Sequence, residues 1–153
     1  MGLNDNTGYA EYSGNLRLEN MYEIVKSISF CYGHRLLNYV GPCAHLHGHN
    51  ASVDIKLASE NLDERGMVMD FSDVKSVVKK WLDENLDHTM LLSAEDPIIP
   101  VLEQAGEKFY VMEKNPTAEN IAEYIYEFVE RQGFPVVDVT LWETSTSYAR
   151  YSR

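Results

Sequence analysis

The 153-residue sequence is poor in cysteine, with Cys31 and Cys43 as its only two. Two cysteines can form one disulfide at most, and they cannot build a paired Cys-x-x-Cys metal site. We therefore expect two free thiols. The sequence also has no His-Glu-x-x-His motif, which excludes the helical zinc site of many metalloproteases.

Long apolar runs and basic residues are missing as well. No run approaches the roughly 20 apolar residues needed to cross a bilayer, and the opening MGLNDNTGYAEYSGN lacks the features of a signal peptide. Lys and Arg total 13 against 24 Asp and Glu, a net charge of −11. This charge argues against nucleic acid and membranes as partners, and we expect a cytoplasmic protein.

What the sequence does contain is typical of one globular domain. Hydrophobic residues make up 44% and charged residues 24%, an ordinary balance for a chain of this length. Residues 1–20 are polar and are expected to form an N-terminal arm, followed by a single domain over 21–153.

Hydrophobic periodicity predicts an α+β fold, with helices packed on one face of an antiparallel sheet. Ser72 and Thr117 are the expected N-caps of the two long helices. The predicted strands are 21–34, 47–57, 108–112, 135–145 and 147–151, and the predicted helices are 70–86, 95–106 and 115–133.

The segment PCAHLHGHN, residues 42–50, concentrates three of the five histidines. His47 and His49 are two residues apart on a predicted strand, so their side chains project from the same face. His34 ends the preceding predicted strand and supplies a third donor. Because catalytic zinc commonly takes three protein ligands, we favour a metal site over ordinary polar residues at strand ends. His45 is expected outside the ligand set.

Four further residues could carry chemistry near such a metal. Cys43 lies in the loop before His47, where a nearby cation would activate its thiol, whereas Cys31 is expected to be a small buried residue within a strand. Asp87 and His88 are adjacent and could form an acid–base pair. Glu143 lies on the apolar side of a predicted strand, where a carboxylate is costly unless it is paired; it could instead lie at the strand's exit into water.

Six segments in order resemble the 6-pyruvoyltetrahydropterin synthase and 6-carboxytetrahydropterin synthase family. They are FCYGHRL, CAHLHGHN, GMVMDFSDVK, LDHTML, NPTAENIAEYIYE and WETSTSYARY. The resemblance implies a tunnelling fold, an antiparallel four-stranded sheet with two long helices on one face. It also implies trimeric barrels stacked as a homohexamer, with active sites between subunits, so that Glu143 would serve a neighbouring chain's metal.

By position, the resemblance implies zinc ligands, catalytic groups and an anchor for the pterin ring. The zinc ligands would be His34, His47 and His49, the catalytic groups would be Cys43, Asp87 and His88, and the anchor would be Glu143. The implied cofactor is Zn²⁺, and the implied substrate is 7,8-dihydroneopterin triphosphate. Arg35 and Lys26 are candidates for binding its triphosphate, although either could be a solvated surface charge.

The compact Cys-x-x-x-His-Gly-His spacing, together with MDF and NPT, is more similar to the bacterial queuosine-pathway branch. That branch implies a lyase that forms 6-carboxy-5,6,7,8-tetrahydropterin and releases acetaldehyde and triphosphate. The alternatives are a 6-pyruvoyltetrahydropterin synthase, which eliminates triphosphate, and a non-catalytic zinc- or pterin-binding protein. A hydrolase that uses zinc hydroxide is less favoured, because it needs neither Cys43 nor Glu143.

Overall fold

The computed structural model describes residues 20–153, so the expected arm lies outside the described residues except for Asn20. The strands are β1 (Tyr22–His34), β2 (His47–Ser59), β3 (Thr89–Ser93), β4 (Phe109–Met112), β5 (Val136–Thr144) and β6 (Ser147–Ser152). The helices are α1 (Phe71–Val74), α2 (Lys80–Asn85), α3 (Ile99–Ala105) and α4 (Ala118–Arg131).

All six strands form one mixed sheet in the order β4-β3-β1-β2-β5-β6. The pairs β1–β3 and β3–β4 are parallel, and the remaining pairs are antiparallel. The expected antiparallel four-stranded sheet is therefore wrong. The sequence pattern does not reveal β3 because four of its five residues are buried, and a strand buried on both faces shows no alternation.

The longest pairing joins β1 to β2 in an unbroken antiparallel register, from Tyr22 opposite Ser59 to His34 opposite His47. Burial alternates along β2, so that Val53, Ile55 and Leu57 face the core. Since a strand exposes opposite faces at successive residues, this register also fixes which side chains share a face at the histidine end.

The first long helix is continuous from α1 through a π-helical turn, Lys75–Lys79, to α2. Its N-cap is Asp70, whose carboxylate accepts a hydrogen bond from the Ser72 N–H at 2.8 Å. The expectation that Ser72 is the cap is wrong by two residues. Asp is as good a cap as Ser, and it also favours the positive end of the helix dipole. Thr117 is confirmed as the cap of α4.

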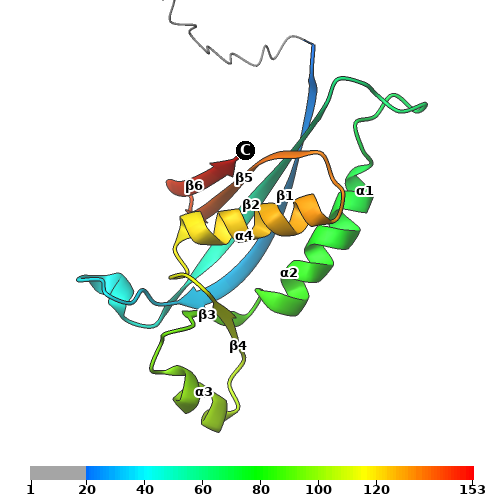
Figure 1. Ribbon diagram of the computed structural model, residues 1–153. Coiled ribbons are helices and arrows are strands. Elements are labelled where there is room, and N and C mark those ends of the chain that lie inside the picture. Colours follow the sequence, from blue (N-terminus) through cyan, green and yellow to red (C-terminus); the bar gives the residue numbers. More distant parts are fainter. Residues whose placement is uncertain (1–19) are drawn as a thin grey trace, which may run out of the picture.

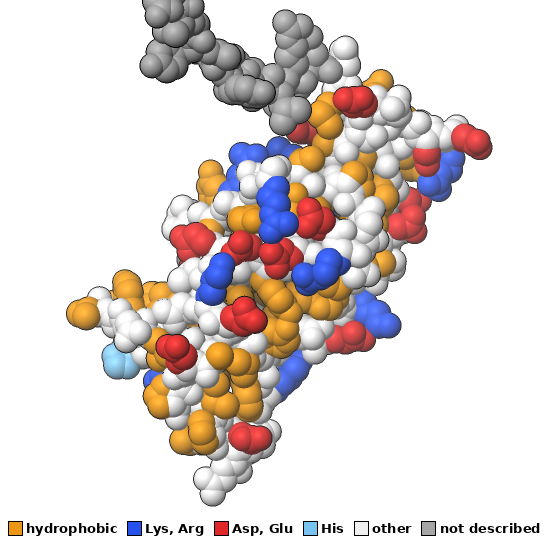
Figure 2. Space-filling model, in the orientation of Figure 1, with side chains coloured by type: hydrophobic (Ala, Val, Ile, Leu, Met, Phe, Trp, Pro, Cys, Tyr) orange, Lys and Arg blue, Asp and Glu red, His pale blue; other side chains and the backbone are white. Residues whose placement is uncertain are grey.

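The α1–α2 helix and α4 cross one face of the sheet (Figure 1). Their buried residues, among them Val78, Leu82, Ile121 and Ile125, join the inward residues of β1, β2 and β5 in one core. On the face shown in Figure 2, acidic and basic side chains are intermixed over the described residues. No helix in residues 20–153 is both long enough and apolar enough to span a membrane.

Gly33 and Gly48 lie opposite each other between the paired strands, and they differ in what a side chain would meet. A Cβ at Gly48 would lie 2.9 Å from the main-chain oxygen of Tyr32. A Cβ at Gly33 would meet the flexible end of Met90 and would lie farther, 3.3 Å, from a main-chain oxygen, that of His47. Gly48 therefore allows the two backbones to lie close together.

We predict that Gly48→Ala lowers the free energy of unfolding by about 1–3 kcal/mol, because the strands must separate. Gly33→Ala is the matched control and should cost less than about 1 kcal/mol, since the Met90 side chain can move. Chemical denaturation of both variants tests this. Equal losses would show that the Tyr32 oxygen is not the constraint.

Candidate functional site

Three histidines from two paired strands meet on the helix-covered face of the sheet. His34 ends β1, and His47 and His49 begin β2. The Nε2 atom of His34 lies 3.0 Å from that of His47 and 3.2 Å from that of His49. The structure thus brings together the three residues that the sequence singled out as metal ligands.

Hydrogen bonds at the opposite ring nitrogens orient two of these imidazoles. His34 Nδ1 donates to the main-chain oxygen of Pro116 at 2.6 Å, and His47 Nδ1 donates to that of His45 at 2.8 Å. Each bond leaves the Nε2 lone pair directed at the common centre, as in known metal sites. The His45 ring is exposed, so this residue lies outside the ligand set, as expected, and acts through its carbonyl.

Burial lowers the pKa of His34 below its ordinary value and outweighs the opposing effects of the Pro116 carbonyl and Glu143. A neutral imidazole is the form that binds a metal. Zn–N bonds of about 2.0–2.1 Å in a tetrahedral site place their nitrogen atoms about 3.3 Å apart. The two distances from His34 Nε2 are close to this spacing, and one ligand atom from each histidine lies within 4.8 Å of the others, so the residues fit a zinc ion with one open position.

Glu143, near the end of β5, lies beside these histidines in the same chain. Its Oε1 atom is 3.8 Å from the Nε2 atoms of both His34 and His49. The buried Tyr32 donates a hydrogen bond from its hydroxyl to the same oxygen at 2.7 Å. Glu143 therefore adjoins its own chain's histidines, and within residues 20–153 its Oε2 atom has no hydrogen-bond partner.

Sequence reasoning did not assign a role to Tyr32. Burial next to the Glu143 carboxylate raises the pKa of the phenol, which therefore stays protonated and keeps donating. Its ring packs edge-on against His34, with centroids 5.3 Å apart. Strand parity in the sequence could have indicated this role, because Tyr32 is two residues from His34 and therefore lies on the same face of the strand.

Asp87 and His88 meet Cys31, not Cys43. One potential ligand atom from each of Cys31, Asp87 and His88 lies within 4.8 Å of the other two. Cys43 lies in a short 3₁₀ turn, Pro42–Ala44, and belongs to neither cluster of metal-binding side chains found in the described part of the chain.

The expectation that Cys31 is a buried strand residue is wrong. Cys31 is partly exposed and lines a cavity of about 720 Å³ together with His88 and Lys108. Its parity in β1 is opposite to that of Tyr32 and His34, so its side chain belongs to the face of the sheet that the helices leave open. That parity was readable in the sequence.

The two candidates for triphosphate binding are not free groups near the histidines. Arg35 donates two hydrogen bonds to the buried carboxylate of Asp96, the one from its Nε atom measuring 2.8 Å. Lys26 lies eight residues before His34 on β1, which corresponds to about 26 Å at 3.3 Å per residue. Within one chain, a single substrate cannot reach both Lys26 and the histidines.

The model of the 6-pyruvoyl tetrahydropterin synthase family matches residues 23–153. The chain belongs to this family. A 6-carboxy-5,6,7,8-tetrahydropterin synthase of Rickettsia bellii is 38% identical over 135 residues, which cover 84% of this chain and 98% of the relative. An enzyme of the same name from Aquifex aeolicus is 35% identical over 158 residues, which cover 85% and 97% of the two chains.

A crystal structure of an uncharacterized protein from Wolinella succinogenes has the same fold. It is 29% identical, with a TM-score of 0.74 over 87% of this chain and 98% of that chain. The family and its named members identify the protein as an enzyme of the tetrahydropterin synthase type.

We predict that Arg35→Met lowers the free energy of unfolding by about 3 kcal/mol at neutral pH, because it leaves the buried Asp96 carboxylate without its partner. Hydrogen bonding to Arg35 holds the pKa of Asp96 below its ordinary value. The stabilisation is therefore present above about pH 4 and is lost as the pH falls through the lowered pKa. Chemical denaturation at pH 7 and in acid measures this effect. The decrease in unfolding free energy caused by Arg35→Met should be smaller in acid than at pH 7.

The double variant Arg35→Met/Asp96→Asn is the control. It should recover most of the lost stability, since no unpaired charge remains buried. A loss that is independent of pH, or one that the double variant does not recover, would rule out this ion pair as the cause.

Proposed function

We propose that the protein is a zinc-dependent lyase that converts 7,8-dihydroneopterin triphosphate to 6-carboxy-5,6,7,8-tetrahydropterin, with release of acetaldehyde and triphosphate. This reaction would place it in the biosynthesis of queuosine and related 7-deazapurines. The observation that carries the proposal is the convergence of three histidine Nε2 atoms beside the Glu143 carboxylate. The names of the Rickettsia and Aquifex relatives support this product.

In this proposal His34, His47 and His49 hold the zinc ion, and Glu143 anchors the pterin. The Oε2 atom of Glu143 accepts an N–H of the flat heterocycle, while Tyr32 holds Oε1. A zinc ion bound there supplies Lewis-acid polarisation of the hydroxyl oxygens on the substrate's side chain, which acidifies the neighbouring C–H bond. The anchored ring fixes the distance between that side chain and the histidines.

Proton transfer falls to Cys43, Asp87 and His88. The His88 imidazole contacts the Asp87 carboxylate, with 2.9 Å between Nδ1 and Oδ2. Such a contact orients the ring, so that the imidazole can exchange protons with the substrate. The Cys43 thiol is the second proton donor and acceptor, acting while triphosphate leaves.

The position of the acid–base pair favours sites shared between chains. Asp87 and His88 meet Cys31 on the open face of the sheet, whereas His34, His47 and His49 project from the helix-covered face. The pair therefore cannot serve the metal of its own chain through the sheet. We propose a homohexamer, a dimer of trimers, in which the pair acts on a substrate held by a neighbouring chain.

We predict that the zinc-loaded protein, incubated with 7,8-dihydroneopterin triphosphate, yields the carboxytetrahydropterin and an equal amount of acetaldehyde. Mass spectrometry of the pterin and an aldehyde assay measure the two products. A pyruvoyl product without acetaldehyde would replace the proposal with triphosphate elimination alone. Binding of zinc and pterin without turnover would favour a binding protein.

A pair of substitutions separates metal binding from proton transfer. His47→Ala should abolish both zinc binding at the histidine centre and turnover, because only two Nε2 donors remain there. Cys43→Ala should retain zinc and lose at least about a hundredfold in turnover, the usual contribution of an acid–base group. Metal analysis and steady-state rates test both. Turnover by metal-free His47→Ala would refute the metal mechanism, and full turnover by Cys43→Ala would refute the role of the thiol.

A further inference from the structure

Cys31 is attached to the Asp87–His88 turn through both of its main-chain groups. Its N–H donates to Asp87 Oδ1 at 2.8 Å, and its carbonyl oxygen accepts from the N–H of His88 at 2.8 Å. The next residues, Tyr32 and Thr89, begin the parallel pairing of β1 with β3. The backbone therefore fixes the position of the thiol next to the carboxylate and the imidazole.

The turn is held in a conformation that side chains rarely adopt. His88 has φ = +51° although it is not glycine, and such residues concentrate where the surrounding structure imposes a functional geometry. The His88 side chain is 79% exposed, whereas that of Asp87 is 22% exposed. The imidazole can therefore meet a ligand from solvent while the carboxylate remains fixed beneath it.

Burial alone would raise the pKa of the Asp87 carboxyl, but the hydrogen bonds from the Cys31 N–H and His88 outweigh it, and the pKa lies below its ordinary value. Asp87 is thus a carboxylate over the whole physiological range. The nearby Lys108 ammonium donates to the main-chain oxygen of Asp87 at 3.2 Å and not to its carboxylate. The carboxylate oxygens are engaged only by Cys31 and His88 among the residues the structure describes.

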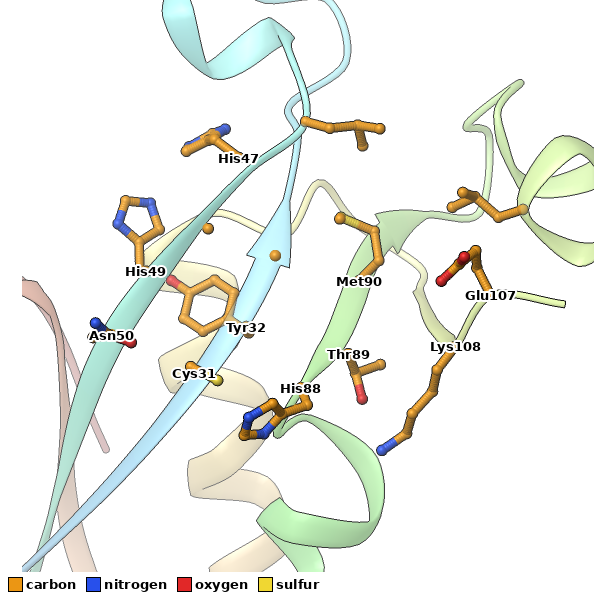
Figure 3. A pocket seen from close by; sticks show the side chains of 14 residues that line it. Cys31, Tyr32, His47, His49, Asn50, His88, Thr89, Met90, Glu107 and Lys108 are labelled. Carbon is orange, nitrogen blue, oxygen red and sulfur yellow. The ribbon is translucent and has the colours of Figure 1, made fainter. Parts of the chain in front are cut away.

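This cluster is separate from the three histidines. Figure 3 shows the Cys31 sulfur directed toward His88 on one side of the paired strands β1 and β2, whereas His47 and His49 project from the other side. Cys31 and His88 line the 720 Å³ cavity, which is open to solvent. His47 and His49 also line this cavity, although their side chains project from the other side of the paired strands (Figure 3).

We infer that Cys31, Asp87 and His88 form a second metal site, which takes a thiophilic divalent cation such as Zn²⁺. One atom from each residue already lies within 4.8 Å of the others. A thiolate, an imidazole and a carboxylate together form a donor set that suits zinc, with the cavity left for a fourth ligand. Binding displaces the thiol proton to solvent, and no bond other than S–H is broken.

Occupation of this site has a consequence for turnover that rests on the proposed function. A cation on the Asp87 carboxylate and the His88 imidazole occupies the groups assigned to proton transfer. Excess Zn²⁺ should therefore inhibit the enzyme, whereas the ion at the histidine centre is required. The metal site itself does not depend on this assignment, so it is tested by binding and spectroscopy.

The experiment is a titration of the full-length, zinc-loaded protein with Co²⁺, followed by absorption spectroscopy and metal analysis. We expect two metal ions per chain at saturation, and a thiolate-to-cobalt charge-transfer band in the near ultraviolet. Cys31→Ser should lose the band and leave one ion per chain. His88→Asn should also leave one ion, and Asn tolerates the positive φ, so the turn is expected to keep its fold.

Cys43→Ser is the matched control, because Cys31 and Cys43 are the only thiols of the chain. It should keep the charge-transfer band and both ions, and His47→Ala should lose only the first ion. A single ion per chain in the unsubstituted protein, or a band that disappears with Cys43 and persists without Cys31, would overturn the second site. Neither result would alter the test of the histidine centre.

Discussion

The candidate site depends above all on the register between β1 and β2. That register pairs His34 with His47 and Tyr32 with His49, which places three imidazoles and a phenol on one face. A shift of one residue would turn the side chains of one strand to the opposite face. Gly48 allows the two backbones to approach, because a Cβ there would lie 2.9 Å from the Tyr32 oxygen. The three imidazoles are thus positioned by main-chain hydrogen bonds between paired strands, not by a flexible loop.

The two faces of the sheet carry two different clusters of reactive side chains. On the covered face, burial keeps His34 neutral, and Tyr32 fixes one oxygen of Glu143. On the open face, Cys31, Asp87 and His88 meet beside a cavity that opens to the surface. Because neighbouring residues of β1 alternate between these faces, Cys31 and Tyr32 serve different clusters although they are adjacent.

Much of the architecture was readable from periodicity. The alternation in 21–34 and 47–57 predicted β1 and β2, and the helical spacing of Val74, Val78 and Leu82 predicted the first long helix. Thr117 was recognisable as a cap, whereas the first helix begins with Asp70, two residues before the expected Ser72. The missed strand β3 is short and buried on both faces, and such a strand has no alternation to detect.

The sequence by itself determined that three histidines share one face of the sheet, since the His-x-His spacing and the parity of His34 place them there before any tertiary contact is known. Only the tertiary structure decided which thiol meets Asp87 and His88, because a contact between β1 and the turn after α2 joins residues 56 positions apart. It also decided that Arg35 belongs to Asp96, and that Glu143 adjoins its own chain's histidines. Local pattern fixes the face of each side chain, whereas strand order decides its neighbours.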